Sequence, residues 1–133
     1  MRLRSRLHYV IAVSAALFAM TGAGTSFAAE TAKPPSFKQD VLPILQEHCA
    51  QCHAPGQIGY QAIGLDLTTY RGVMAGSRHG PTVIPYQPQI GSMMKVLDWK
   101  QDYYVHMPAM SHQLPEADMN VIRDWIAAGA KDN

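Results

Sequence analysis

Apolar side chains recur at helical spacing near both ends of the main part of the chain, and no segment alternates as a β-strand would. The first stripe follows Ser36, which pairs with Gln39 three residues later as in a capping box. Its members share one face of a helix that runs into Cys49: Phe37, Val41, Ile44, Leu45 and His48. Pro43 is unfavourable inside a helix. Either the helix kinks there, or it begins at Asp40 with Pro43 in its first turn.

The clearest helix is predicted near residue 120. Pro115 suits a first helical position, and Glu116 and Asp118 suit a first turn. Gly129 is a plausible C-terminal cap. The apolar stripe of this helix consists of Val121, Ile122, Trp125 and Ile126.

The middle of the chain predicts short helices separated by glycine- and proline-rich segments. Thr68 or Thr69 could cap one helix, which ends at Gly76, and Ser92 could cap another. Three segments are expected to be loops: residues 54–66, 76–91 and 100–113. The predicted fold class is therefore all-α.

Residues 1–28 have the pattern of a secretory signal peptide. Three arginines precede an apolar run over residues 10–20, and the small residues Ser26 and Ala28 stand at both positions that a signal peptidase reads. The run is shorter than the roughly 20 residues of a spanning helix, which makes an uncleaved anchor the less favoured alternative. We expect cleavage after Ala28, a polar tail over residues 29–35, a domain over residues 36–130 and a periplasmic location.

Removal of residues 1–28 changes the charge balance. Eleven Lys and Arg less three leave eight against ten Asp and Glu, which is a net charge of −2 with histidine neutral. No basic patch suggests binding to nucleic acid. A chain of this size buries only a modest core, so a large buried cofactor would help to stabilise it.

The segment Cys49-Ala50-Gln51-Cys52-His53 carries the candidate chemistry. Two thiols three positions apart can each add to one vinyl group on the same edge of a haem, and the following histidine then lies under the iron. This spacing is the sequence pattern of c-type haem attachment. We therefore expect one covalent haem c per chain, bonded to Cys49 and Cys52, with His53 as an iron ligand.

Two other kinds of site use cysteines at this spacing. A thioredoxin-like pair follows a strand, whereas this pair follows a predicted helix. A structural zinc site needs four ligands. His106 and His112 could supply the other two, but the gap between the two pairs is far longer than in compact zinc fingers.

The sixth iron ligand must come from another part of the chain. Met107 and Met110 lie in the loop before the last helix, where a sulfur could reach across the cofactor and raise its reduction potential. His106 and His112 are the alternatives and would give bis-histidine ligation. The other methionines after residue 28 fit core packing: Met74, Met93, Met94 and Met119.

Further pieces of the chain occur in the order known from one family. They are Asp40-Val41, Pro43-Ile44-Leu45, Gly64-Leu65-Asp66-Leu67, Tyr70-Arg71-Gly72-Val73-Met74, Met107-Pro108 and Trp125-Ile126-Ala127-Ala128-Gly129-Ala130. Together with the cysteine–histidine motif, they make residues 36–130 resemble the single-haem, planctomycete-type cytochrome c domains within the class I fold. The chain departs from the family at Tyr86, where glycine is commoner, and at Ala109, where a second proline often stands.

The resemblance implies a small helical domain wrapped around one haem, with long loops and with the first and last helices packed together. It also implies thioether links at Cys49 and Cys52, His53 as proximal ligand and Met107 as distal ligand. Met107 is thereby favoured over Met110.

The expected function is transport of single electrons between redox proteins outside the cytoplasm, with no enzymatic reaction. The partners are expected to bind transiently, and neither nucleic acid nor membrane is expected to bind after signal cleavage. Two alternatives stay open. The chain could be the cytochrome subunit of a periplasmic dehydrogenase or reductase, or a sensor or peroxidase-like protein whose sixth ligand is displaceable.

Overall fold

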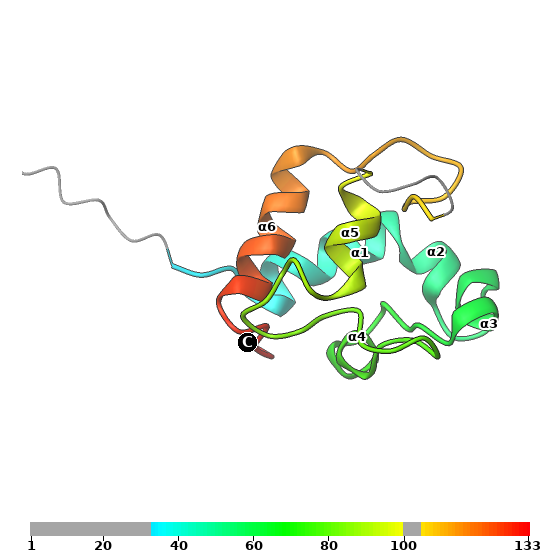
Figure 1. Cartoon of the computed structure of the whole chain (residues 1–133), viewed down its shortest axis with the longest axis horizontal. Helices are drawn as coiled ribbons and strands as arrows, with labels where there is room; N and C mark the ends of the chain where they lie inside the picture. Colours follow the sequence, from blue (N-terminus) through cyan, green and yellow to red (C-terminus); the bar gives the residue numbers. More distant parts are fainter. Residues whose placement is uncertain (1–32, 100–104) are drawn as a thin grey trace, which may run out of the picture. The chain divides into compact units, whose positions relative to one another are not determined.

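The computed structural model describes residues 33–99 and 105–133 (Figure 1). The expected signal peptide, residues 1–28, the first part of the expected tail and residues 100–104 lie outside the described part. The helices run over Phe37–Val41 (η1, a π-helical turn), Leu42–His48 (α1), Ala50–His53 (α2), Ile58–Ile63 (α3), Tyr70–Ala75 (α4), Ser92–Leu97 (α5) and Glu116–Ala127 (α6). The described residues contain no strand and one isolated bridge, between Ser77 and Gly80. The all-α fold class is confirmed for them.

The two adjoining helices η1 and α1 form the first helical run. Ser36 caps this run, but its reciprocal partner differs from the expected one. The Ser36 hydroxyl accepts a hydrogen bond from the Gln39 backbone N–H at 3.3 Å, as a capping box requires. The Ser36 N–H donates to the carboxylate of Asp40 at 2.6 Å rather than to the Gln39 side chain. The expected partner was therefore wrong by one residue, because the chain enters a wider π-helical turn here.

That π-helical turn accommodates Pro43. Proline has no N–H and cannot donate to the preceding turn. The hydrogen bonds ahead of it span five residues, with the Val41 N–H bound to the Ser36 carbonyl at 3.1 Å and the Leu42 N–H bound to the Phe37 carbonyl. Pro43 therefore lies in the first turn of α1. This agrees with the second sequence alternative, except that the α-helix begins at Leu42 and not at Asp40.

The last helix, α6, follows the sequence expectation closely. Pro115 is its N-cap rather than its first residue, and Gly129 stands just after the C-cap with φ +105°. The φ of Gly129 is one that glycine adopts without steric cost. Ile122, Trp125 and Ile126 are buried, so the predicted apolar stripe is the face that meets the core.

The first helical run and α6 are in contact (Figure 1). The rings of Phe37 and Trp125 lie 5.3 Å apart, and His48 Nε2 lies 3.6 Å from a carboxylate oxygen of Asp118. The packing of the first helical run against the last helix was an expectation from the family resemblance. It is present here as a direct contact.

Asn133 closes the same junction from the other end of the domain. Its backbone oxygen accepts from the Lys38 N–H at 3.0 Å and from the Ser36 hydroxyl at 2.6 Å. Its side-chain oxygen accepts from the Phe37 N–H at 2.9 Å. The packed unit thus continues past residue 130.

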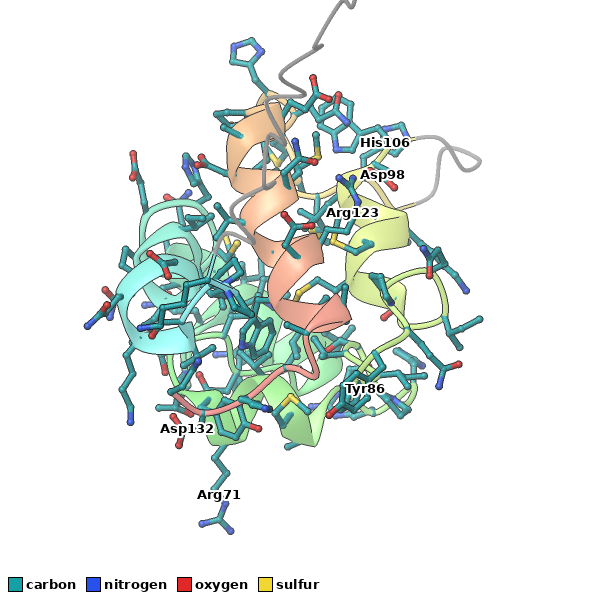
Figure 2. The ribbon with its side chains drawn as sticks, turned by 90° about the vertical axis from the view of Figure 1, so that its left-hand side faces the viewer. Arg71, Tyr86, Asp98, His106, Arg123 and Asp132 are labelled. Atoms are coloured by element: carbon teal, nitrogen blue, oxygen red, sulfur yellow. The ribbon has the colours of Figure 1, made fainter. Side chains whose placement is uncertain are left out.

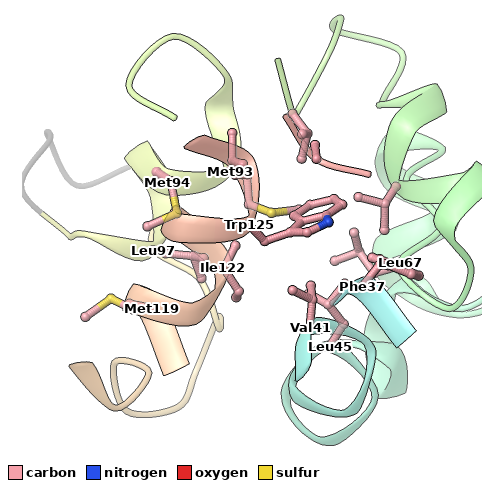
Figure 3. Packing of buried hydrophobic residues seen from close by; sticks show 14 of the residues in the cluster. Phe37, Val41, Leu45, Leu67, Met93, Met94, Leu97, Met119, Ile122 and Trp125 are labelled. Carbon is pink, nitrogen blue, oxygen red and sulfur yellow. The ribbon is translucent and has the colours of Figure 1, made fainter. Parts of the chain in front are cut away.

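The hydrophobic core has α6 at its centre (Figure 3). On one side, Ile122 and Trp125 face the first helical run. On the other side they face α5. The labelled side chains of these two neighbours are Phe37, Val41 and Leu45 from the first run and Met93, Met94 and Leu97 from α5. Burial of this cluster is the main favourable contribution to folding.

The predicted caps of the short helices α4 and α5 differ in outcome. Thr69 caps α4, with its hydroxyl accepting from the Gly72 N–H at 3.0 Å, and α4 ends at Gly76 as expected. Ser92, by contrast, is the first residue of α5 and makes no capping hydrogen bond; Gly91 is the N-cap. The prediction for Ser92 was therefore wrong.

The loop predictions are confirmed over residues 76–91 and 105–113, whereas residues 54–66 contain the helix α3. No apolar stripe predicted α3, because none of its residues is buried and a glycine stands inside it. Across the described ranges, no helix is both long and apolar enough to cross a membrane.

Candidate functional site

The cysteine–histidine motif lies in one short helical stretch at the end of the first helical run. Cys49 joins α1 to α2, and its N–H donates to the Leu45 carbonyl at 2.9 Å. The His53 N–H donates to the Cys49 carbonyl, also at 2.9 Å. Residues three positions apart on a helix lie on the same side. The structure therefore brings Cys49, Cys52 and His53 together.

The two thiols are free but unequally exposed. Cys49 is half-buried and packs against the hydrophobic core, whereas Cys52 is exposed. Burial raises the pKa of the Cys49 thiol to about 11, and the neighbouring Cys52 acts in the same direction. Cys49 is therefore protonated at neutral pH, and the exposed Cys52 thiol is the more accessible of the two.

His53 is the buried polar group at the centre of the motif. Its side chain is 7% exposed, and its Nδ1 is buried with no hydrogen-bond partner among the described residues. Burial lowers the pKa of His53, against a smaller opposing effect from the Leu65 backbone. The imidazole is therefore neutral at pH 7, which is the form that binds metals. A buried nitrogen without a partner is rare in native proteins and calls for an explanation.

Helix α3 lies directly against the His53 ring. A Cβ atom at Gly59 would stand 2.9 Å from His53 Cε1 and 2.8 Å from the Cys52 carbonyl oxygen. Only glycine permits an approach this close. The backbone of His53 is bound separately, with the Leu67 N–H donating to the His53 carbonyl at 2.9 Å. Gly59 thus lies against the ring of His53, and Leu67 binds its main chain.

Arg78 fixes the end of α3. Its guanidinium donates to the carbonyls of Ala62 at 3.0 Å and of Gln61 at 2.9 Å. The helix then stops at Gly64, which has φ +73°. Because the contact of Gly59 with His53 depends on the fold, no sequence signal marked it.

The candidates for the sixth ligand differ sharply in their surroundings. Met107 is half-buried and packs against the same core as Cys49. Met110 is fully exposed, with φ +61°, and His112 is exposed. The ring of His106 is stacked on Trp99 at a centroid distance of 4.8 Å. Of the four, Met107 has the surroundings best suited to a buried ligand.

The donor set fits a covalent haem. Two free thiols one helical turn apart, a neutral buried imidazole next to them and a half-buried thioether on another segment are the groups that haem c uses. No three side chains of His, Cys, Asp or Glu gather as a metal-binding group within residues 33–99 and 105–133. The zinc alternative finds no support there.

No family model, no curated protein and no solved structure matches this chain. The interpretation of the site therefore depends on its own geometry. That geometry is defined by the stretch from Cys49 to His53, by helix α3 against the His53 ring and by the Met107 segment.

Proposed function

We propose that the chain is an exported c-type cytochrome with a class I-like fold, which carries single electrons between redox proteins. The observation that carries the proposal is the buried imidazole of His53, whose Nδ1 has no hydrogen-bond partner among the described residues, in one helical stretch with two free thiols. A structural role for the motif would leave the imidazole nitrogen unexplained. A haem iron binds a neutral imidazole nitrogen as a ligand and would give the buried His53 side chain a partner.

The two cysteines are proposed to hold the cofactor covalently. Each thiol adds across one vinyl group: a sulfur–carbon bond forms, the thiol hydrogen goes to the other vinyl carbon, and the vinyl double bond becomes single. No oxidant or reductant is consumed, provided that both sulfurs arrive as thiols, and both are free in the structure. The half-buried Cys49 would hold the haem next to the core, and the exposed Cys52 would hold it nearer to solvent.

His53 and Met107 are proposed to fill the two axial positions of the iron. When bound, haem supplies a one-electron ferric–ferrous couple, and a histidine–methionine pair raises its reduction potential. Gly59 and the Leu67 N–H hold the His53 ring and backbone in place, which restricts the orientation of this ligand. With both positions filled by the protein, no substrate needs to reach the iron, and electrons enter and leave through the haem edge.

The proposal also covers location and partners. The chain is exported through a signal peptide cleaved near Ala28, acts in the periplasm and docks transiently with its donors and acceptors. Weak electron-transfer complexes bury less than about 1,200 Å² in total. A permanent place in an oxidoreductase complex and a sensor with a displaceable ligand are the competing outcomes.

The test is the covalent state of the haem in the full chain, produced in a host that assembles c-type cytochromes. We expect one haem per chain that survives acid–acetone extraction and gives the pyridine haemochrome spectrum of a doubly thioether-linked haem. Cys52→Ala shifts that spectrum to the singly linked type. Loss of both cysteines abolishes attachment. Gln51→Ala, which changes the exposed residue between the cysteines, is the matched control and retains the wild-type spectrum.

Extraction of all pigment from the wild type, or failure to attach any, would contradict the proposal. The competing functions have their own readouts. Rapid binding of carbon monoxide to the reduced protein indicates a displaceable ligand and hence a sensor. Constant co-purification of the native protein with one partner indicates a subunit of a complex.

A further inference from the structure

Both backbone groups of Met107 are bound by the end of helix α5. The Met107 N–H donates to the Val96 carbonyl at 3.1 Å. The Met107 carbonyl accepts from the indole N–H of Trp99 at 2.7 Å. The position of this residue is therefore set by protein contacts and does not depend on a bond from its sulfur.

The same Trp99 side chain also engages His106, the neighbour of Met107. The two rings are stacked almost parallel, with their centroids 4.8 Å apart and their planes 6° apart. An imidazole is a common axial ligand of haem iron, and this one stands a single residue away from the proposed thioether ligand. Trp99 thus binds the competing ligand through its ring face and the proposed ligand's backbone through its N–H.

The backbone around Trp99 shows that this arrangement is enforced. Trp99 has φ +53°, a left-handed conformation that is a steric outlier for a bulky residue and persists only where the surroundings fix it. The preceding residue, Asp98, is bound to Arg123 of α6 at 3.1 Å. Figure 2 shows Asp98, Arg123 and His106 near the C-terminal end of α5, beside α6. The strained turn is therefore attached to the core helix.

We propose that Trp99 is a positioning residue that selects Met107 over His106 as the sixth iron ligand. It does so by retaining the His106 ring in a stack while it holds the Met107 carbonyl. This inference rests on the proposed function, because it concerns the choice of ligand for a haem at this site. It goes beyond that function by naming the residue that decides the ligand.

The test compares four holoproteins by the absorption band between methionine sulfur and ferric iron and by the midpoint potential. In Trp99→Leu the stack and the hydrogen bond are both lost, so we expect loss of the band and a lower potential as His106 binds. His106→Gln alone keeps the band. The double variant Trp99→Leu/His106→Gln regains it, because no competing imidazole remains. Trp99→Phe keeps a ring for the stack and is expected to keep the band.

Several outcomes would overturn the inference. An unchanged band in Trp99→Leu shows that Trp99 selects nothing. A band that stays lost in the double variant shows that the defect is structural and does not involve His106. If Trp99→Leu fails to fold, magnetic resonance of the ferrous wild type decides the question: cross-relaxation between the His106 and Trp99 rings is expected, and contact of His106 with the haem contradicts it.

Failure of the proposed function gives a different result. In that case the wild type itself carries no covalent haem. A wild type that carries covalent haem with His106 on the iron overturns only the selection by Trp99 and leaves the covalent attachment intact.

Discussion

At the scale of single residues, the motif owes its geometry to side chains and glycines outside it. His53 is placed by Gly59, whose missing side chain lets α3 touch the imidazole. Met107 is placed by two hydrogen bonds of its backbone, one to the Val96 carbonyl and one from the indole N–H of Trp99. Tyr86 has φ +65°, a backbone conformation that glycine adopts more readily. The family that the sequence resembles commonly has glycine at this position.

The unequal burial of the two cysteines predicts unequal reactivity in the haem-free protein. A pKa of about 11 leaves Cys49 with on the order of a hundredfold fewer thiolates at neutral pH than an unperturbed thiol. We therefore expect iodoacetamide to modify the exposed Cys52 first, with the rate at Cys49 rising as the pH approaches 11. Peptide mass spectrometry follows both sites. Labelling in urea is the control, where the two rates converge; faster labelling of Cys49 in the folded protein would refute the prediction.

Gly59→Ala tests the contact between α3 and the imidazole. The new Cβ meets a backbone oxygen at 2.8 Å and His53 Cε1 at 2.9 Å, and neither belongs to a flexible side-chain end. Overpacking of this kind costs about 1–3 kcal/mol, which we expect in the free energy of unfolding measured with guanidinium. Ala62→Ser, an exposed change in the same helix, should stay within about 0.5 kcal/mol. Equal effects of the two variants would show that α3 does not press on the ring.

At the scale of helices, the sequence was informative where an apolar stripe met a clear end signal. Phe37, Val41 and Leu45 were predicted and are buried, as are Ile122, Trp125 and Ile126 of the α6 stripe, whereas Val121 of that stripe is partly buried. Helix α3 was missed because a helix that rests on a motif rather than on the core carries no stripe. The π-helical turn before Pro43 was missed because sequence pattern reports which face is apolar, not how many residues each hydrogen bond spans.

The two predicted caps that turned out differently make a matched pair. Thr69→Ala removes a hydroxyl that accepts from the Gly72 N–H at 3.0 Å and should destabilise the protein by about 1 kcal/mol. Ser92→Ala removes a hydroxyl that caps nothing and should change stability by less than about 0.5 kcal/mol. Chemical denaturation of both variants checks the order. A larger loss in Ser92→Ala would mean that α5 begins elsewhere.

At the scale of the whole molecule, one junction unites the described domain. Phe37, Trp125 and Asn133 bring the first helical run, α6 and the last residues together. The sequence predicted the two helices and, through the family resemblance, their contact. It could not predict the tie at Asn133, because hydrogen bonds between residues 96 apart leave no local pattern. For the proposed sixth ligand, the sequence left Met107, Met110, His106 and His112 open, and the structure shows that Met107 is half-buried whereas Met110 is fully exposed.

Substitution of the two tryptophans should destabilise the protein to different extents, because Trp125 lies in this junction and Trp99 does not. Trp125 is 1% exposed, and its indole N–H donates to the Lys131 carbonyl at 2.9 Å. Trp125→Phe leaves a gap and an unpaired carbonyl, so we expect a loss of about 1–3 kcal/mol and joint loss of hydrogen-exchange protection in the first run and α6. Trp99→Phe, at the edge of the fold, should cost less and leave that protection intact. Protection lost in α6 alone would show that the two helices do not unfold together.

The meeting of Ser36 with Asn133 has a consequence for protein engineering. Because their atoms are in hydrogen-bond contact at 2.6 Å, a few flexible residues could join one end of the domain to the other. New termini could then be opened within the irregular segment of residues 76–91, since rearranged chains are tolerated where the two joined ends are adjacent and the cut falls in a loop. In such a circularly permuted chain, the ribosome would synthesise the Met107 segment before the cysteine pair. The order in which the two sides of the proposed site are made would thus be reversed.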